Sequence, residues 1–212
     1  MVGNTGSGKS YALMVLLGIY ASLPNVSVTI CDFKLSSFAQ FQNSPNFYGY
    51  QDVPRGIRKV YKEFEYRLGA NDESRNKHIE VLVIDEYGAL ILSQGKKEAE
   101  EIKAMISSML FMSRALGIKI LLGSQRLGAD LFCGGARDQA KSTIGLGNLS
   151  KEQKGMLFAD YKDEMTHLNG VGEGYLLIDG QGLERIKIAR IDDIDALNDR
   201  IRMAMDGAGD EA

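Results

Sequence analysis

Apolar residues along this chain recur at two spacings, one typical of strands and the other typical of helices. The β-branched run from Val26 to Cys31 follows a turn at Pro24-Asn25 and predicts a strand. Two more strands are predicted over Glu80–Asp85 and Gly117–Gly123. The four successive apolar residues from Val81 to Ile84 indicate a strand buried on both faces, as in a parallel sheet.

Apolar residues at helical spacing occupy most of the segments between these strands. The first helix is predicted from Tyr11 to about Ala21, and Ser150 with Gln153 in the following turn predicts the capped start of a short helix. The predicted helices cover residues 11–21, 53–68, 97–116, 150–158 and 191–205, and a polar loop is predicted over 71–78.

The C-terminal third adds strands of another kind. A strand is predicted over 142–146, and the runs 174–179 and 183–189, joined by Gly180-Gln181-Gly182, predict a β-hairpin at the edge of the sheet. The alternation of strands and helices therefore predicts an α/β fold with a mostly parallel sheet flanked by helices, closed by a hairpin and a helix. We expect a core over residues 1–190, and over 191–212 a helix that docks on its own domain and an acidic tail.

A glycine-rich stretch near the N-terminus fits the pattern G-x-x-x-x-G-K-[ST] at every fixed position, which is typical of a phosphate-binding loop. Its glycines allow the backbone N–H groups to turn toward a polyphosphate, and the helix that follows points its positive end at the anion. The residues predicted to bind nucleotide are Gly3, Asn4, Thr5, Gly6, Ser7, Gly8, Lys9, Ser10 and Tyr11.

Only Met1 and Val2 precede this loop, although such a loop normally follows a buried strand. Either the first strand is cut to a stub or the sequence is a piece of a longer protein. We favour the second interpretation.

Two adjacent acids, Asp85 and Glu86, end the strand predicted to be most deeply buried. Adjacent strand residues point to opposite sides, so we expect different tasks for them: one to complete a Mg²⁺ site with Ser10 and the other to polarise the attacking water. Gln125 ends the next strand along, where it is placed to sense a γ-phosphate or merely to cap a turn. Asp32 and Lys34, at the end of another strand, are either ligand-facing or a surface ion pair.

Composition narrows the choice of partners. The 212 residues carry a net charge of −3 and a pI of about 5.5, so any nucleic-acid contact has to be local. Cys31 and Cys133 suggest reduced thiols in a cytoplasmic protein. His167 has no cysteine or second histidine at metal spacing, and we expect His78 to lie in solvent. No apolar run reaches the ~20 residues of a membrane helix, so we expect membrane contact only through regions or partners outside this chain.

Four ordered motifs together resemble the FtsK/SpoIIIE family of hexameric DNA-translocating ATPases. They are the loop from Gly3 to Ser10, Cys31-Asp32-Phe33-Lys34, the strand from Val81 to Glu86, and the segment from Ser113 to Arg126. The resemblance covers roughly residues 1 to 190 and implies a RecA-like P-loop motor core that binds ATP and Mg²⁺. Such a minimal core fits motors of plasmids, conjugative elements or phages as well as chromosome partitioning.

The resemblance also implies roles for individual residues. Lys9 and Ser10 would bind nucleotide and metal, Asp85 would be the metal-side acid and Glu86 the catalytic base. Gln125 would be the γ-phosphate sensor, and Arg114 would act near a neighbouring subunit's nucleotide in a hexameric ring, with Arg126 and Arg137 as competitors for that role. Phe33, Ser124 and Leu127 depart from the residues that the family carries there.

Three functions stay open at this point. The chain is a DNA translocase core that acts as a ring on double-stranded DNA, a protein-secretion ATPase of the type VII kind, or a non-enzymatic nucleotide-binding module that organises assembly. The segments suited to DNA are those near Lys96-Lys97 and from Arg126 to Lys141.

Overall fold

The computed structural model describes residues 1–70 and 78–207. Residues 71–77 of the predicted polar loop and most of the predicted acidic tail lie outside these ranges. The strands are β1 Val2–Gly3, β2 Val26–Asp32, β3 Phe47–Gly49, β4 Ile79–Asp85, β5 Ile118–Leu122, β6 Ser142–Leu146, β7 Glu173–Ile178 and β8 Gly182–Lys187. The α-helices are α1 Lys9–Ala21, α2 Val53–Gly69, α3 Tyr87–Ser93, α4 Lys96–Met112, α5 Lys151–Leu157 and α6 Ile194–Asp206.

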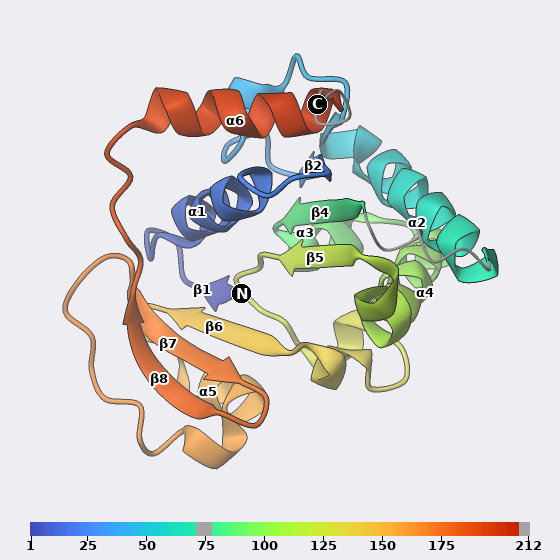
Figure 1. Ribbon diagram of the computed structural model, residues 1–212. Helices are drawn as coiled ribbons and strands as arrows, with labels where there is room; N and C mark the ends of the chain where they lie inside the picture. Colours follow the sequence, from blue (N-terminus) through green and yellow to red (C-terminus); the bar gives the residue numbers. More distant parts are fainter. Residues whose placement is uncertain (71–77, 208–212) are drawn as a thin grey trace.

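The strands form two four-stranded sheets. One is fully parallel in the order β3-β2-β4-β5, and the other has the order β1-β6-β7-β8 with β1 parallel to β6 and the remaining pairs antiparallel. A parallel bridge between Val2 and Ser124 links the two sheets. The structure thus confirms an α/β fold with a mostly parallel sheet, and the hairpin β7–β8 lies at the edge of the second sheet (Figure 1).

Helices cover both faces of the parallel sheet, and alternation along β4 divides the core between them. Leu82 and Ile84 belong to a cluster with α2, α3 and α4, whereas Val81 and Val83 belong to a cluster with α1 and α6. Period-two alternation with apolar residues on both faces is the pattern that a doubly covered strand requires. The carboxyl end of β4 therefore lies between two helical layers (Figure 1).

Three local features differ from the sequence prediction. The helix predicted to reach residue 116 ends at Met112 and continues as a 3₁₀ turn over Ser113–Leu116, which Gly117 closes with a φ of 69°. The helix α3 and the strand β3 were not predicted, because segments of seven and three residues are too short to carry a recognisable period.

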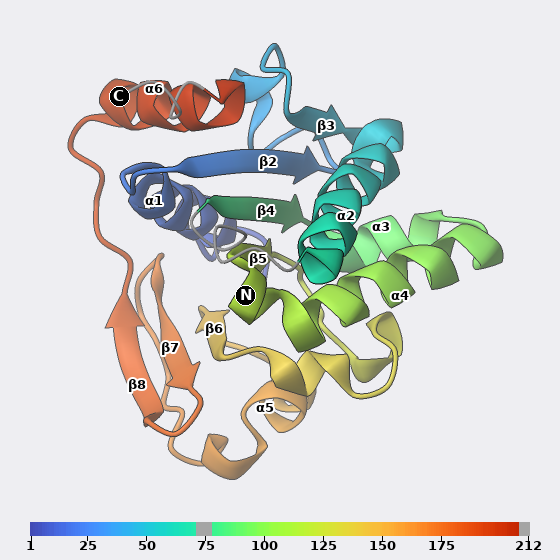
Figure 2. The same cartoon turned by 45° about the vertical axis from the view of Figure 1, so that its right-hand side comes forward.

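The C-terminal helix α6 packs across α1 and β2 after a long connection from β8 (Figures 1 and 2). Ile201 and Met205 are fully buried in that contact. Gly18 permits the close approach of the two helices, because a Cβ there would lie 2.0 Å from Leu197 Cδ1. The helix that carries the phosphate-binding loop is thus held from behind by the end of the chain.

This packing predicts unequal effects for two neighbouring substitutions on α6. Ile201→Ala removes a side chain with 0% exposure and should lower the free energy of unfolding by about 2–4 kcal/mol. Met203→Ala, at a side chain with 61% exposure, is the control and should change it little. Urea unfolding of both variants measures the difference, and equal losses would contradict the docking of α6.

Candidate nucleotide-binding site

The loop from Asn4 to Gly8 joins β1 to α1 at the carboxyl ends of the parallel strands. Gly6 and Gly8 adopt left-handed φ values of 79° and 92°. Gly3 serves a different purpose from the one its place in the motif suggested, because a Cβ there would lie 2.4 Å from Ser7 Oγ. The loop therefore combines two turns that favour glycine with one close approach.

Side chains around the loop fix its position. Asn4 donates to the Asn148 carbonyl at 3.1 Å, and Thr5 accepts from Gln125 Nε2 at 3.2 Å. The Tyr11 hydroxyl accepts from the backbone N–H of Ile191. Each of these contacts ties the loop or α1 to a distant part of the chain.

Lys9 lies at the centre of the site and is only 8% exposed. Its Nζ is 2.6 Å from Asp85 Oδ1 and 3.9 Å from Glu86 Oε2. Ser10 Oγ donates to Asp85 Oδ2 at 3.2 Å. The structure thus brings the lysine and the hydroxyl of the loop onto the two predicted acids.

Glu86 leaves the strand and takes a left-handed conformation with φ of 61°. Its carboxylate accepts from the Gln125 N–H at 2.8 Å and pairs with Lys34 Nζ at 2.7 Å. Because β4 ends at Asp85, strict alternation no longer applies, and both carboxylates reach Lys9. The expectation that the two acids point to opposite sides is therefore wrong.

The charge state of Asp85 is set by two opposing effects. Burial of the carboxyl disfavours ionisation, but the charge and hydrogen bond of Lys9, with hydrogen bonds from Ser37 and Ser10, more than offset it and hold the pKa of Asp85 below its usual range. An ionised carboxylate beside a hydroxyl oxygen is the kind of donor set that suits Mg²⁺. Among residues 1–70 and 78–207, no group of three or more His, Cys, Asp or Glu could hold a metal ion.

Asp32 and Lys34 do not form the surface ion pair that the sequence left open. Asp32 is fully buried and accepts from the N–H groups of Ser37 and Phe38 at 2.9 and 2.8 Å. Lys34 turns to Glu86 instead. The loop after β2 is therefore folded back onto the site.

The cysteines are both free thiols. Burial raises the pKa of Cys31, so this thiol stays protonated at neutral pH.

The structure leaves the predicted arginines outside this cluster. Arg114 is exposed in the turn before β5, at the end of that strand opposite to Gln125. Arg126 pairs with Glu152 at 3.4 Å and Arg137 pairs with Asp138 at 3.1 Å. None of the three is recorded in contact with Lys9, Asp85 or Glu86 in the described part of the chain.

Two residues of the site were missed by sequence reasoning. Ser37 Oγ lies 2.8 Å from Ser10 Oγ, and no pattern in its loop marks it. Gln153 donates to the Gln125 carbonyl at 2.6 Å. The structure contains the complete capping box of Ser150 and Gln153. The capping pattern in the sequence does not predict this second contact of Gln153.

No model of a known protein family matches the sequence. Curated relatives include the Ftsk domain-containing protein YdcQ of Bacillus subtilis, 24% identical over 189 residues, covering 82% of this chain and 39% of that protein. The DNA translocase FtsK of Borreliella burgdorferi is 29% identical over 161 residues, covering 63% of this chain and 20% of that protein. The chain thus spans well under half the length of these relatives.

Solved structures share the fold at low sequence identity. The pCW3 conjugation coupling protein TcpA, determined with ATPγS, aligns with a TM-score of 0.71 at 19% identity over 95% of this chain and 63% of that one. The cytoplasmic domain of the type VII secretion ATPase EccC from Thermomonospora curvata gives 0.69 at 20% identity over 100% of this chain and 28% of that one. The genome packaging NTPase B204 of Sulfolobus turreted icosahedral virus 2 gives 0.54 at 17% identity over 88% of this chain and 94% of that one.

In the described residues, no helix is both long and apolar enough to cross a membrane. The chain shares its fold with the TcpA and EccC structures. The curated relatives and structural neighbours confirm the resemblance to FtsK/SpoIIIE-type ATPases that the ordered motifs indicated.

Proposed function

We propose that this chain is the ATP-hydrolysing motor core of a ring-shaped oligomer that translocates double-stranded DNA. The observation that carries the proposal is the convergence of Lys9, Asp85, Glu86 and Gln125 at one end of three parallel strands. Similarity to FtsK translocases supports the choice of cargo. A cytoplasmic location follows from that choice.

Different residues of the chain would bind the phosphates and the metal ion. Lys9 would supply a point charge to the β- and γ-phosphates, and the loop from Gly3 to Gly8 would supply backbone N–H groups. Ser10 and Asp85 would hold Mg²⁺, which when bound neutralises charge on the phosphate oxygens. Tyr11, anchored to Ile191, would keep α1 in place behind the loop.

Glu86 is the group that would take a proton from the attacking water, and Gln125 would orient that water or the γ-phosphate. The contacts of Glu86 with Lys34 and the Gln125 N–H hold its carboxylate beside Lys9 before nucleotide binds. Because Lys34 is 43% exposed, it can release the carboxylate without large rearrangement.

Assembly would complete the site. Arg114 is exposed in the turn before β5, whereas Gln125 of the nucleotide-binding site follows the other end of that strand. We therefore assign Arg114 to the nucleotide of a neighbouring subunit. An arginine supplied in this way is worth ~10³-fold or more in rate in related phosphoryl-transfer enzymes. Arg126 and Arg137 stay as competitors.

A type VII secretion motor is the second candidate, because EccC aligns over the whole chain at nearly the same TM-score as TcpA. The segment assigned to DNA is the start of α4, where two lysines precede Glu98, Glu100 and Glu101. Lys96 and Lys97 are exposed at the start of α4, and no ion pair is recorded for either within residues 1–70 and 78–207. Lys141, by contrast, is paired with Asp179 at 2.8 Å.

Two substitutions should separate nucleotide binding from turnover. Lys9→Ala should abolish ATP binding, since it removes the charge on the phosphates. Glu86→Gln should retain binding and lower kcat by about 10²–10⁴-fold, the usual range for a lost general base. Calorimetry and steady-state ATPase assays measure the two effects, with Glu184→Gln on the exposed edge of β8 as the matched control. An unaltered rate in Glu86→Gln would mean that Glu86 is not the base.

Turnover per subunit should rise with protein concentration, because the site needs a neighbour's arginine. The isolated core should be a slow ATPase at high dilution, and Arg114→Ala should remove the concentration dependence while leaving ATP affinity intact. ATPase rates across a dilution series, with light scattering on the same samples, test this. A flat specific activity in a sample that stays monomeric would exclude the ring.

Duplex DNA should stimulate the assembled ATPase, and the logarithm of its affinity should fall linearly with the logarithm of salt concentration. Neutralising Lys96 and Lys97 together to Gln should reduce the slope by about 0.9 for each lost phosphate contact and leave ATP affinity unchanged. Lys151→Gln with Lys162→Gln, an equal change of charge at two other exposed lysines, is the control. An active ring with neither stimulation nor salt-dependent binding would favour the secretion motor.

A further inference from the structure

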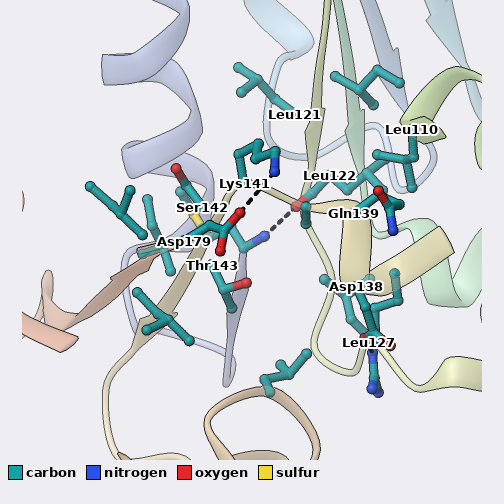
Figure 3. Close-up of a pocket in the computed structure, with 18 of the residues that line it drawn as sticks. Leu110, Leu121, Leu122, Leu127, Asp138, Gln139, Lys141, Ser142, Thr143 and Asp179 are labelled. Atoms are coloured by element: carbon teal, nitrogen blue, oxygen red, sulfur yellow. Dashed lines mark hydrogen bonds and ion pairs between the residues drawn. The ribbon is translucent and has the colours of Figure 1, made fainter. Parts of the chain in front are cut away.

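Two cavities of the described structure contain none of the predicted nucleotide-binding residues. One, of about 1020 Å³, lies between β5 and β6, and Lys141 and Asp179 in its lining form an ion pair (Figure 3). The other, of about 700 Å³, lies between α2 and the amino ends of β2 and β4. We call it the basic cleft, because the α2 residues that line it include Arg55, Arg58, Lys59, Lys62 and Arg67.

The exposed cations of the basic cleft lie along one side of α2. Arg55, Lys59 and Lys62 follow the spacing i, i+4 and i+7, so their side chains leave the helix on the same side. At 1.5 Å per residue this row is ~10 Å long. Glu63 pairs with Arg67 at 2.6 Å, but within residues 1–70 and 78–207 no ion pair is recorded for Lys59 or Lys62. The charge of these two lysines is therefore available to an anion.

Lys59 is held at the cleft by groups beneath it. Its Nζ donates to Asn46 Oδ1 at 2.6 Å and to Thr29 Oγ1 at 3.5 Å, and Thr29 in turn donates to Glu80 at 2.9 Å. Burial raises the pKa of the Glu80 carboxyl, and the charge of Lys59 opposes that shift, so the two groups attract each other. A lysine that is already ordered loses less conformational entropy when a ligand binds to it.

Arg58 joins the basic cleft to the start of α4. It is hydrogen-bonded to Glu98 at 3.0 Å and to Glu101 at 2.9 Å. Both acids lie in the first two turns of the helix that begins with Lys96 and Lys97, the segment assigned to DNA under the proposed function. The cleft thus adjoins that segment, with Arg58 offsetting part of the negative charge between them.

We propose that the basic cleft is a second DNA contact of this chain, in which Lys59 and Lys62 bind phosphate groups of the duplex backbone. The choice of DNA as the ligand rests on the proposed function and on the continuity of the cleft with the start of α4. Phosphates of one strand advance ~3.4 Å along the axis for each base pair, so a row of ~10 Å, ending at Arg55, matches about three of them. Because every base pair carries the same phosphates, the contact is independent of sequence.

The test measures how the affinity of the nucleotide-free chain for a labelled DNA duplex depends on salt. Lys59→Gln with Lys62→Gln should reduce the slope of log affinity against log salt by about 1.8, since each lost phosphate contact removes about 0.9. The loss of affinity between about 50 and 200 mM salt should therefore be about tenfold smaller than in the unaltered chain. Lys151→Gln with Lys162→Gln, at two other exposed lysines, is the matched control. Equal slopes in the two double variants would overturn the proposal.

Two further variants separate the loss of charge from damage to the fold. Lys62 has no recorded hydrogen bond or ion pair in the described part of the chain, so Lys62→Gln alone should leave Tm unchanged and reduce the slope by about 0.9. Lys59→Arg with Lys62→Arg keeps both charges and should keep the slope. An unaltered slope in Lys62→Gln, or a loss in the arginine variant as large as in the glutamine variant, would overturn the proposal.

Stimulation of ATP turnover by the same duplex separates this proposal from the proposed function. Stimulation of the assembled ATPase together with an unaltered slope in the Lys59 and Lys62 variant would overturn the cleft assignment alone. Binding that depends on the two lysines without stimulation would support the cleft and count against translocation. Vesicles of phosphatidylcholine with phosphatidylglycerol are the second probe. Lysine-dependent binding to these vesicles but not to the duplex would overturn the assignment to DNA.

Discussion

The whole site depends on one buried ammonium group between two carboxylates. Lys9 is 8% exposed, and a charge so placed is stable only when it is paired and hydrogen-bonded. Asp85 meets this requirement at 2.6 Å, with Glu86 further off at 3.9 Å. Because Lys9 opens α1 while the acids end β4, this contact fixes the phosphate-binding loop relative to the central strand. The rest of the structure supports that placement, with α6 behind α1 and three helices against the other face of β4.

If the loop binds a polyphosphate as proposed, the same contact would let the site receive the anion. A polyphosphate at the loop would offer Lys9 new oxygen partners, so one buried ion pair would be exchanged for another and the lysine would not be left uncompensated. Asp85, freed from Lys9, would then turn its negative charge to a cation beside Ser10. Glu86 could likewise exchange its ion pair with Lys34 for another partner, since Lys34 is the most exposed of the charged residues in this cluster.

Sequence reasoning predicted those site residues whose roles follow from strand ends. Asp85, Glu86 and Gln125 end two neighbouring parallel strands, and their carboxyl ends meet at one edge of the sheet, so they had to lie near the loop at Gly3. The conformation of Glu86 could not be predicted, because its left-handed φ depends on the turn into α3, a helix too short to carry a signal. Ser37 and the pairing of Lys34 depend on the fold of the loop after β2, where buried Asp32 accepts two backbone N–H groups. Arg114 is exposed in the turn before β5, and its role between subunits stays a prediction.

The connection between the two sheets sets a mechanical constraint on any motor built from this chain. Val2 bridges Ser124 on one side and pairs with Gly145 on the other, so the strand that carries the loop is also the joint between the parallel sheet and the β6–β8 sheet. Gln153 in α5 donates a hydrogen bond to the Gln125 carbonyl, and the Asn4 side chain donates one to the Asn148 carbonyl. Both hydrogen bonds therefore involve residues of the same site. The residues that position the phosphate-binding loop are therefore also residues that join the two sheets.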